Sequence, residues 1–273
     1  MRKPVDILQR ILIHKAEEIA RGQTLQTIYD LEAMIKNQED PRGFCANIVA
    51  TINAGKPAVI AELKKASPSK GVIRSDFEPE LIAKSYAQNG ATCLSVLTDV
   101  NFFQGHNDFL SVARKVSGLP TLRKDFLIDR WQVVESRAIG ADCVLLFIAA
   151  LEDAQVTDLV AAATDYGMDV LLEVHDRREL DRALTVDVGL IGINNRNLHT
   201  FETRLDTTLE LVEHIPNGRL VVTESGIQSA ADVIAMQDQG VHSFLIGETL
   251  LRESDPGEKL AELLCVQPIE EDT

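Results

Sequence analysis

The chain has 273 residues, of which 45% are hydrophobic and 25% are charged, and its formal net charge is −15. This length suits one large barrel or two ordinary domains of a soluble protein. The acidic balance argues against a surface that binds nucleic acid or an anionic membrane, because both need a basic face.

Residues 1–47 are expected to form helices that precede the first strand. The apolar residues Ile7, Leu8, Ile11, Leu12 and Ile19 recur at helical spacing, which predicts an amphipathic helix. Charged residues interrupt this stretch, so it lacks the apolar core of a signal peptide. The sequence has no run of about 18 apolar residues that would span a bilayer, and its four cysteines form no C-x-x-C pair. We therefore expect a protein of the reducing cytoplasm.

Eight short β-type runs follow, at 58–64, 92–98, 120–126, 142–148, 169–175, 189–195, 220–226 and 242–248. Helical stretches separate them, an alternation typical of a parallel sheet built from βαβ units. In NGATCLSV, IGADCVLL and QGVHSFLI, a glycine that ends a helix stands two residues before the next strand. One supersecondary unit is therefore repeated along the chain.

Eight such units predict an α/β protein with a (β/α)8 TIM barrel and extra N-terminal helices. We expect a single domain, with the barrel at 48–265 and an acidic tail at 266–273. The alternative is an open doubly wound sheet, which would need a G-x-G-x-x-G turn after the first strand. SPSKG stands there instead.

Polar residues gather where the predicted strands end, which is the face that carries the active site in such barrels. They are Glu62, Lys64, Lys124, Glu173, His175, Asn194, Asn195, Arg196, Glu224 and Ser225. Side chains two apart share a strand face, so the two members of each of three pairs should point the same way: Glu62 with Lys64, Glu173 with His175, and Asn194 with Arg196. His175 is expected to be a hydrogen-bonded rim histidine rather than a catalytic one. No pair of His or Cys has ligand spacing, so no metal site is predicted.

The last two units carry a second signal. TESGI (223–227) and LIGETLL (245–251) each place a glycine at a strand end just before a helix. Backbone N–H groups and the helix dipole favour an anion there, and loops seven and eight of these barrels frequently bind phosphate. An acidic protein with an anionic substrate needs local cations, and Lys64, Lys124 and Arg196 would supply them.

These segments resemble the indole-3-glycerol phosphate synthases of tryptophan biosynthesis. The resemblance runs from about Ile7 to Leu264, and the matching segments in order are IAELKKASPSKG, SVLTDVNFFQG, LRKDFLID, LLEVHD, GINNRNL, VTESGI and FLIGETLL. It implies a lyase that closes the ring of 1-(2-carboxyphenylamino)-1-deoxyribulose 5-phosphate with loss of CO₂ and water. No cofactor is implied.

The resemblance also implies roles for individual residues. Lys124 would be the general acid at the ribulose carbonyl oxygen, and Glu173 the general base of the later dehydration. Lys64 would pair with a substrate anion and support proton transfer, while Glu62 positions the lysines. The remaining expected contacts are substrate binding by Ser67, Phe103, Phe126, Asn194, Arg196 and Glu224, and phosphate binding by Ser225, Gly226, Gly247 and Glu248.

Two other functions remain open at this point. Lys124 could be the Schiff-base nucleophile of a sugar-phosphate aldolase, or the barrel could bind a phosphorylated metabolite without catalysis. The expected partner is a small phosphorylated substrate, with no nucleic acid and no membrane. We expect a monomer or weak homodimer, with possible transient contact to other tryptophan-pathway enzymes. A further hypothesis is that the N-terminal helices cover the mouth of the barrel.

Overall fold

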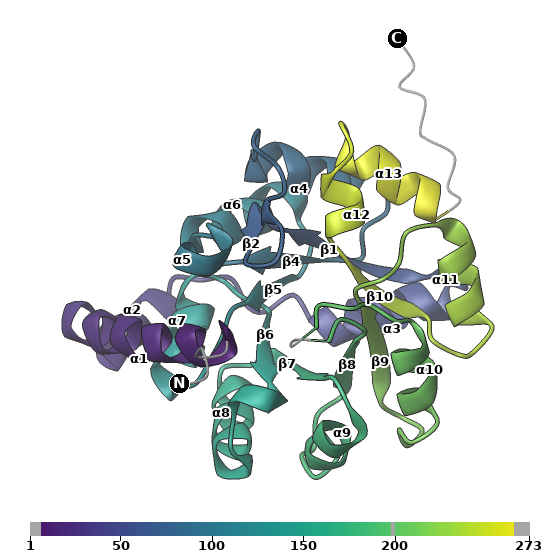
Figure 1. The fold of residues 1–273 in the computed structure, drawn as a ribbon. Coiled ribbons are helices and arrows are strands. Elements are labelled where there is room, and N and C mark those ends of the chain that lie inside the picture. The colour runs from purple at the N-terminus through teal and green to yellow at the C-terminus, as the bar shows by residue number, and fades with distance from the viewer. Residues whose placement is uncertain (1–6, 198–199, 265–273) are drawn as a thin grey trace, which may run out of the picture.

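The computed structural model describes residues 7–197 and 200–264, and these residues form a closed barrel of eight parallel strands surrounded by helices (Figure 1). The strands follow one another around the barrel in the order β1-β10-β9-β8-β7-β6-β5-β4. Their bounds are β1 (Ala58–Leu63), β4 (Cys93–Leu97), β5 (Thr121–Lys124), β6 (Cys143–Phe147), β7 (Asp169–Val174), β8 (Leu190–Asn194), β9 (Leu220–Glu224) and β10 (Ser243–Ile246). The predicted (β/α)8 TIM barrel with extra N-terminal helices is confirmed.

At least one helix follows each strand of the barrel. These helices are α4 (Pro79–Gln88), α5 (Val100–Phe103), α6 (Asn107–Ser117), α7 (Arg130–Ala138), α8 (Asp153–Asp165), α9 (Arg177–Ala183), α10 (Asp206–Val212), α11 (Ala230–Gln237), α12 (Glu248–Leu251) and α13 (Pro256–Leu263), with the 3₁₀ turn η1 (Ile148–Ala150) after β6. A two-residue hairpin of β2 (Ala66–Ser67) and β3 (Gly71–Val72) lies between β1 and α4. No helix within the described ranges is long and apolar enough to cross a membrane.

Local sequence explains where several of these elements begin and end. Asp129 and Ser229 cap α7 and α11, and each also donates its backbone N–H to the side chain of the third helical residue. Gly90, Gly140 and Gly240 have φ values of 94°, 95° and 81°, the left-handed conformation that a glycine after a helix adopts without steric cost. The three glycine junctions of the sequence are therefore helix ends, as predicted.

Three helices precede the barrel: α1 (Ile7–Leu25), α2 (Ile28–Ile35) and α3 (Phe44–Asn53). In Figure 1, α1 and α2 lie together on the outside of the barrel beside α7. Helix α3 contacts β1 and β4 and contributes the fully buried Phe44 and Ile48. The expected boundary at residue 48 falls inside α3, and the expected acidic tail at 266–273 lies outside the described residues.

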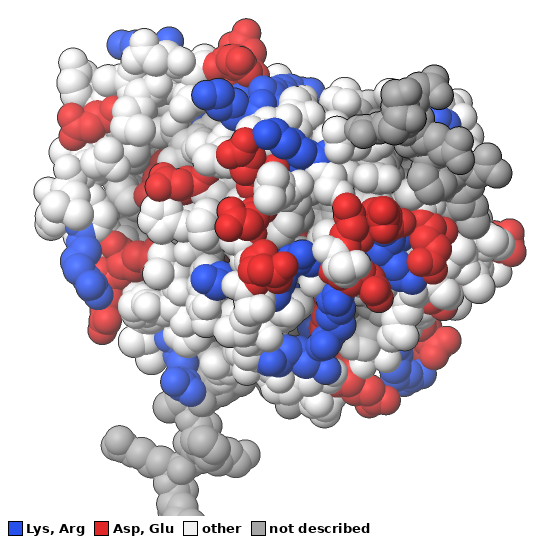
Figure 2. Space-filling view, turned by 90° about the horizontal axis from the view of Figure 1, so that it is seen from above, with Lys and Arg blue, Asp and Glu red and all other residues white. Residues whose placement is uncertain are grey.

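The surface of the barrel mixes charges of both signs. Figure 2 shows acidic and basic side chains close together on the face seen from above. On this face (Figure 2) the acidic side chains therefore lie among basic ones rather than apart from them.

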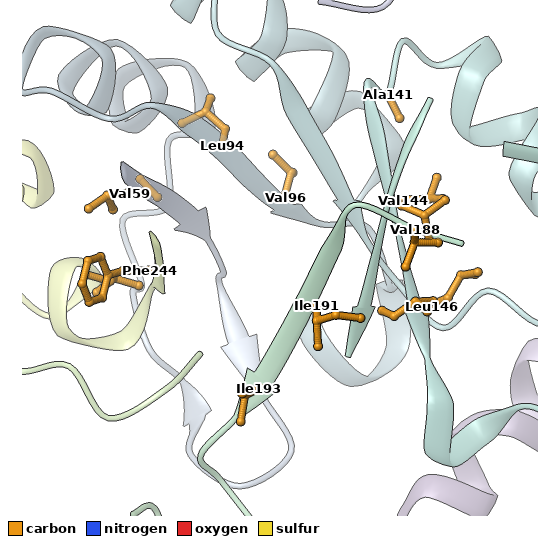
Figure 3. Packing of buried hydrophobic residues seen from close by; sticks show 14 of the residues in the cluster. Val59, Leu94, Val96, Ala141, Val144, Leu146, Val188, Ile191, Ile193 and Phe244 are labelled. Carbon is orange, nitrogen blue, oxygen red and sulfur yellow. The ribbon is translucent and has the colours of Figure 1, made fainter. Parts of the chain in front are cut away.

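Strand alternation divides the buried apolar residues into two layers. Residues of one parity, including Ile60, Leu122 and Leu171, pack with Phe44 and Ile48 in the interior of the barrel. Residues of the other parity pack between strands and helices, and Figure 3 shows this outer layer with Val59, Leu94, Val96, Ala141, Val144, Leu146, Val188, Ile191, Ile193 and Phe244. The interior layer fixes which polar residues face the axis at the strand ends.

Candidate active site

Polar groups at the strand ends stand directly above the apolar interior. Glu62 follows Ile60 by two residues, Lys124 follows Leu122, and Glu173 follows Leu171, so each shares the inward face of its strand. The carboxyl ends of the strands lie at one end of the barrel, because all neighbouring strands are parallel. Titratable side chains from different strands therefore converge.

The converging side chains line a cavity of ≈ 640 Å³. This volume is within the range of small-molecule sites. The wall includes all but one of the residues to which the resemblance assigns a catalytic or binding role: Glu62, Lys64, Phe103, Lys124, Phe126, Glu173, Asn194, Arg196, Glu224, Ser225, Gly226, Gly247 and Glu248.

Ser67 is the residue that does not line this cavity. It lies in β2, is 7% exposed, and its hydroxyl is 3.5 Å from the hydroxyl of Ser69. Ser69, together with Pro68 and Lys70, does line the cavity. The SPSK turn thus reaches the site through the residues that follow Ser67.

Lys124 lies at the centre of a buried ionic cluster. Its Nζ is 2.5 Å from Glu224 Oε2 and 3.3 Å from Glu173 Oε2, and the carboxylates are 1% and 5% exposed. Glu62 pairs with Lys64 at the same level of the barrel. Two of the predicted strand-end cations are therefore held by carboxylates that also face the cavity.

The cluster shifts the pKa values of its members. Burial disfavours the ammonium, but Glu173, Glu224 and Glu62 together raise the pKa of Lys124 above its usual range. Burial likewise opposes ionisation of Glu173, yet Lys124 and His175 hold the pKa of that carboxyl below its usual value. Burial and the neighbouring Glu173 raise the pKa of Glu224. An ammonium beside an ionised carboxylate is the arrangement of a general acid with a general base.

Aromatic rings form an apolar side of the cavity. The ring centroids of Phe103 and Phe126 are 6.2 Å apart, and Phe147 meets Phe126 edge-on at 5.9 Å. Phe147 was not among the residues predicted from the sequence. Its position as the last residue of β6 is the same strand-end signal that identified Lys124.

Asn194 and Arg196 both face the cavity, but each is already engaged. Asn194 Nδ2 donates to Glu173 Oε1 at 2.8 Å, so it orients the carboxylate. Arg196 Nη2 is 3.0 Å from Glu248 Oε2, and Arg252 also pairs with Glu248. The Glu248 side chain therefore holds two arginines beside the predicted phosphate loop.

The two glycine loops lie side by side in the cavity wall. Ser225 has a φ of 64°, which is uncommon for a residue with a Cβ and occurs preferentially at functional sites, and Gly226 follows with 98°. A Cβ at Gly247 would collide with the Glu62 carboxylate. Gly247 therefore also makes room for a buried carboxylate, a role that its motif did not indicate.

A second glycine does the same for another carboxylate, and sequence reasoning missed it. Gly192, in the middle of β8, lies so close to Glu224 that an added Cβ would overlap Oε1 of that side chain. The signal was a glycine on the inward face of a strand, which often marks a close approach by another group.

Replacing Gly192 by alanine is therefore expected to push Glu224 away from Lys124. A displacement of this kind should lower kcat/KM by about 10- to 100-fold, since small misplacements of catalytic groups have effects of that size. Gly189→Ala is the matched control, because nothing lies within 4 Å of a Cβ at Gly189. Steady-state kinetics of both variants would test this, and equal activities would contradict it.

Helix α1 also belongs to the site. Ile7, Leu8 and Ile11 line the cavity, so α1 reaches the mouth of the barrel, which the N-terminal helices were expected to cover. Between Ile11 and Ile19, the buried stripe of α1 contains Lys15, whose side chain is fully buried. The sequence signal for this buried side chain was a lysine within the apolar stripe of a helix.

Lys15 joins α1 to two loops of the active site. Its Nζ is 3.0 Å from Asp99 Oδ2 and 2.8 Å from Asp125 Oδ1, and neither carboxylate is more than 1% exposed. Asp99 Oδ1 accepts from the backbone N–H of Phe103, and Asp125 directly follows Lys124. Burial opposes the charge, but Asp125 and Asp99 raise the pKa of Lys15.

Lys15→Met should lower the free energy of unfolding by about 3–5 kcal/mol, because it removes the ammonium from the buried Asp99 and leaves Asp125 paired with Arg123 at 3.5 Å. Urea denaturation followed by circular dichroism would measure this loss. Lys84→Met is the control, since Lys84 forms an exposed pair with Glu80 on one helix, and such pairs contribute at most about 1 kcal/mol. Equal losses in the two variants would contradict the role of Lys15.

The side chain of His175 lies outside the cavity in which strand alternation would place it. Its parity with Glu173 would direct it into the same cavity, but it lines an adjoining cavity of ≈ 410 Å³ instead. There it is hydrogen-bonded to Glu179, as expected of a rim histidine.

Comparison with known proteins agrees with this geometry. The family model described as indole-3-glycerol phosphate synthase matches residues 8–263. An indole-3-glycerol phosphate synthase of Bordetella pertussis (strain Tohama I) is 55% identical over 260 residues, covering 95% of this chain and 99% of that protein.

Solved structures with similar folds are distant in sequence. KGPDC from Streptococcus mutans has a TM-score of 0.58 and 14% identity, over 76% of this chain and 95% of that chain. The N-acetylmannosamine-6-phosphate 2-epimerase from Clostridium perfringens has a TM-score of 0.59 and 14% identity, over 74% of this chain and 90% of that chain. At this identity the likeness concerns the fold alone.

Proposed function

The chain belongs to the indole-3-glycerol phosphate synthase family, and we propose how its side chains divide the steps of that reaction. The activity is that of a carboxy-lyase in tryptophan biosynthesis. It converts 1-(2-carboxyphenylamino)-1-deoxyribulose 5-phosphate into indole-3-glycerol phosphate, CO₂ and water. The roles of individual residues below are our proposal.

The substrate phosphate would lie against the two glycine loops. Ser225, Gly226, Gly247 and Glu248 line that part of the cavity, and the backbone N–H of Glu248 would donate to the phosphate. Arg196, which pairs with Glu248, would contribute charge beside these loops. At the other end of the substrate, the aromatic ring would lie by Phe103 and Phe126, with its carboxylate toward Lys64. The family resemblance also assigns Ser67 to the carboxylate, a contact that would require the SPSK turn to move.

Ring closure needs an acid. The ring carbon that bears the carboxylate attacks the ketone, and negative charge develops on the ketone oxygen. Lys124 would donate its proton to that oxygen, and its position among Glu173, Glu224 and Glu62 keeps it charged until then. The attack leaves a cationic imine, which accepts the electrons released when the carboxylate departs as CO₂.

Dehydration needs both a base and an acid. Glu173 would remove the proton from the carbon next to nitrogen, while an acid protonates the leaving hydroxide. Asn194 holds Glu173 on one oxygen and Lys124 on the other, so the base and the acid are neighbours. Glu62 would position Lys64, and Glu224 would position Lys124 and contact the substrate.

The contact between Lys124 and its carboxylates is the observation that carries this assignment. A Schiff-base aldolase needs a lysine with a lowered pKa, whereas these carboxylates raise it. Borohydride treatment with a ketose phosphate should therefore leave no adduct on Lys124, and a stable adduct would favour the aldolase.

A direct assay tests the activity itself. Incubation of the protein with the carboxyphenylamino substrate should produce the ultraviolet absorbance of an indole. Absence of turnover, with phosphate binding retained, would favour a barrel that binds a phosphorylated metabolite without catalysis.

We also propose the wider setting of the protein. Its partner would be the small phosphorylated substrate rather than nucleic acid or a membrane, which the mixed charges of Figure 2 support. It would act in the cytoplasm as a monomer or weak homodimer, with transient contacts to other enzymes of tryptophan biosynthesis.

A further inference from the structure

His175 contacts the proposed base from the side opposite Lys124. Its Nε2 is 3.3 Å from Glu173 Oε1, while Lys124 Nζ is 3.3 Å from Glu173 Oε2. The Glu173 carboxylate therefore lies between two cationic groups, one on each oxygen.

Glu179 fixes the orientation of the imidazole. Its Oε2 accepts from the backbone N–H of His175 at 2.8 Å and lies 3.1 Å from Nδ1 of the same residue. A carboxylate cannot donate, so Nδ1 carries a proton and Nε2 is the nitrogen that faces Glu173. Phe147 packs edge-on against the imidazole, with ring centroids 5.0 Å apart.

Nε2 itself has no hydrogen-bond partner among the described residues, although it is buried. Its contact with Glu173 Oε1, at 3.3 Å, is an ion pair. A buried polar atom without a partner calls for an explanation, and catalytic function is one of the usual ones. Here the explanation is electrostatic: a positive charge held beside the base.

We propose that His175 is a positioning residue of the reaction: clamped as an imidazolium by Glu179, it keeps the Glu173 carboxylate ionised and directed at the substrate. This inference rests on the proposed role of Glu173 as the base.

The charges around His175 favour the imidazolium. Glu173 on β7 and Glu179 on α9 face the ring directly, β6 contributes Phe147, and Lys124 on β5 lies beyond Glu173. The wall of the adjoining cavity also contains Asp176, Glu202 and Arg204. Burial opposes the charge, but the adjacent carboxylates of Glu173 and Glu179 raise the pKa of His175 to about 9.

The sign of this shift sets the pH range in which the clamp works. Because the folded-state pKa is raised, the contribution of the ion pairs is fully present below the usual histidine pKa of about 6.5 and is lost as pH rises through about 9. The pKa of Glu173 is lowered, so its carboxylate becomes protonated only at acidic pH. Glu173 should therefore be ionised and held throughout the neutral range.

His175→Gln tests the proposal, because glutamine keeps an N–H donor but removes the charge. We expect kcat to fall about 10-fold with KM changed less than about 2-fold, in the lower part of the range for acid–base groups. The acid limb of the kcat profile should move to higher pH, since the cation no longer lowers the pKa of Glu173. Glu179→Gln should move the alkaline limb to lower pH.

Two measurements separate this role from a merely structural one. Profiles of kcat from pH 3 to 10, a range that includes the acid limb of Glu173, would be recorded with melting temperatures, and His214→Gln, at an exposed histidine, is the control. Wild-type kcat in His175→Gln, or a loss without any shift of the acid limb, would overturn the proposal. If Glu173→Gln itself retained full kcat, the assignment of the base would fail instead, so the two failures are distinguishable.

Discussion

Lys124→Ala is expected to lower kcat by about 10²–10⁴-fold, the range for a positioned general acid. Lys124 is the ammonium that Glu173 and Glu224 hold at the cavity wall. Without it, the ketone oxygen has no proton donor from β5 during ring closure. Binding of inorganic phosphate should persist, because the glycine loops that line the other part of the cavity are unchanged.

Lys124→Arg separates lost chemistry from lost charge. Alanine leaves buried carboxylates unpaired and so also lowers stability. Arginine restores a cation, but a guanidinium does not release its proton at neutral pH. We therefore expect Lys124→Arg to unfold at nearly the wild-type temperature and still lose at least about 10²-fold in kcat. Near-wild-type kcat in either variant would refute the assignment of Lys124.

Glu173→Gln should have the second large effect, again about 10²–10⁴-fold in kcat. Glutamine keeps the size of the side chain and an oxygen that can accept the hydrogen bond from Asn194, but it cannot take up a proton. Because Glu173 is assigned to dehydration, ring closure and loss of CO₂ should still occur in this variant.

Single-turnover experiments would resolve the two steps. In Glu173→Gln, CO₂ should be released before the indole absorbance appears, whereas the wild-type enzyme should show the two signals closer together. Simultaneous slowing of both signals would place Glu173 in ring closure instead. The comparison needs no assumption about product release, since both signals arise within one turnover.

The barrel was predictable because its signals are local. Each predicted run contains its strand, but the runs ended one or two residues later than the strands do, as for 242–248 against Ser243–Ile246. The chain leaves the sheet at these residues to form the loops of the active site. Hydrophobic periodicity marks the buried strand and does not mark where its backbone pairing stops.

All but one of the site residues assigned by strand parity and family resemblance line the cavity. Parity worked for Glu62 with Lys64 and for Asn194 with Arg196, because side chains two apart share a face. It failed for His175, which follows the last residue of β7 and is turned toward Glu179 by the start of α9. Beyond the end of a strand, alternation no longer fixes direction.

The sequence by itself determined the repeated unit, the closed barrel and the strand ends where chemistry gathers, since periodicity, glycine positions and side-chain alternation act over a few residues. Only the tertiary structure decided which charges meet: Lys15 with Asp99 and Asp125, and Lys124 with Glu224, which is 100 residues away in the chain. It also decided that Gly192 and Gly247 leave space for carboxylates. Such pairings depend on the closing of the barrel, which brings distant segments within a few ångströms, and no local pattern records that distance.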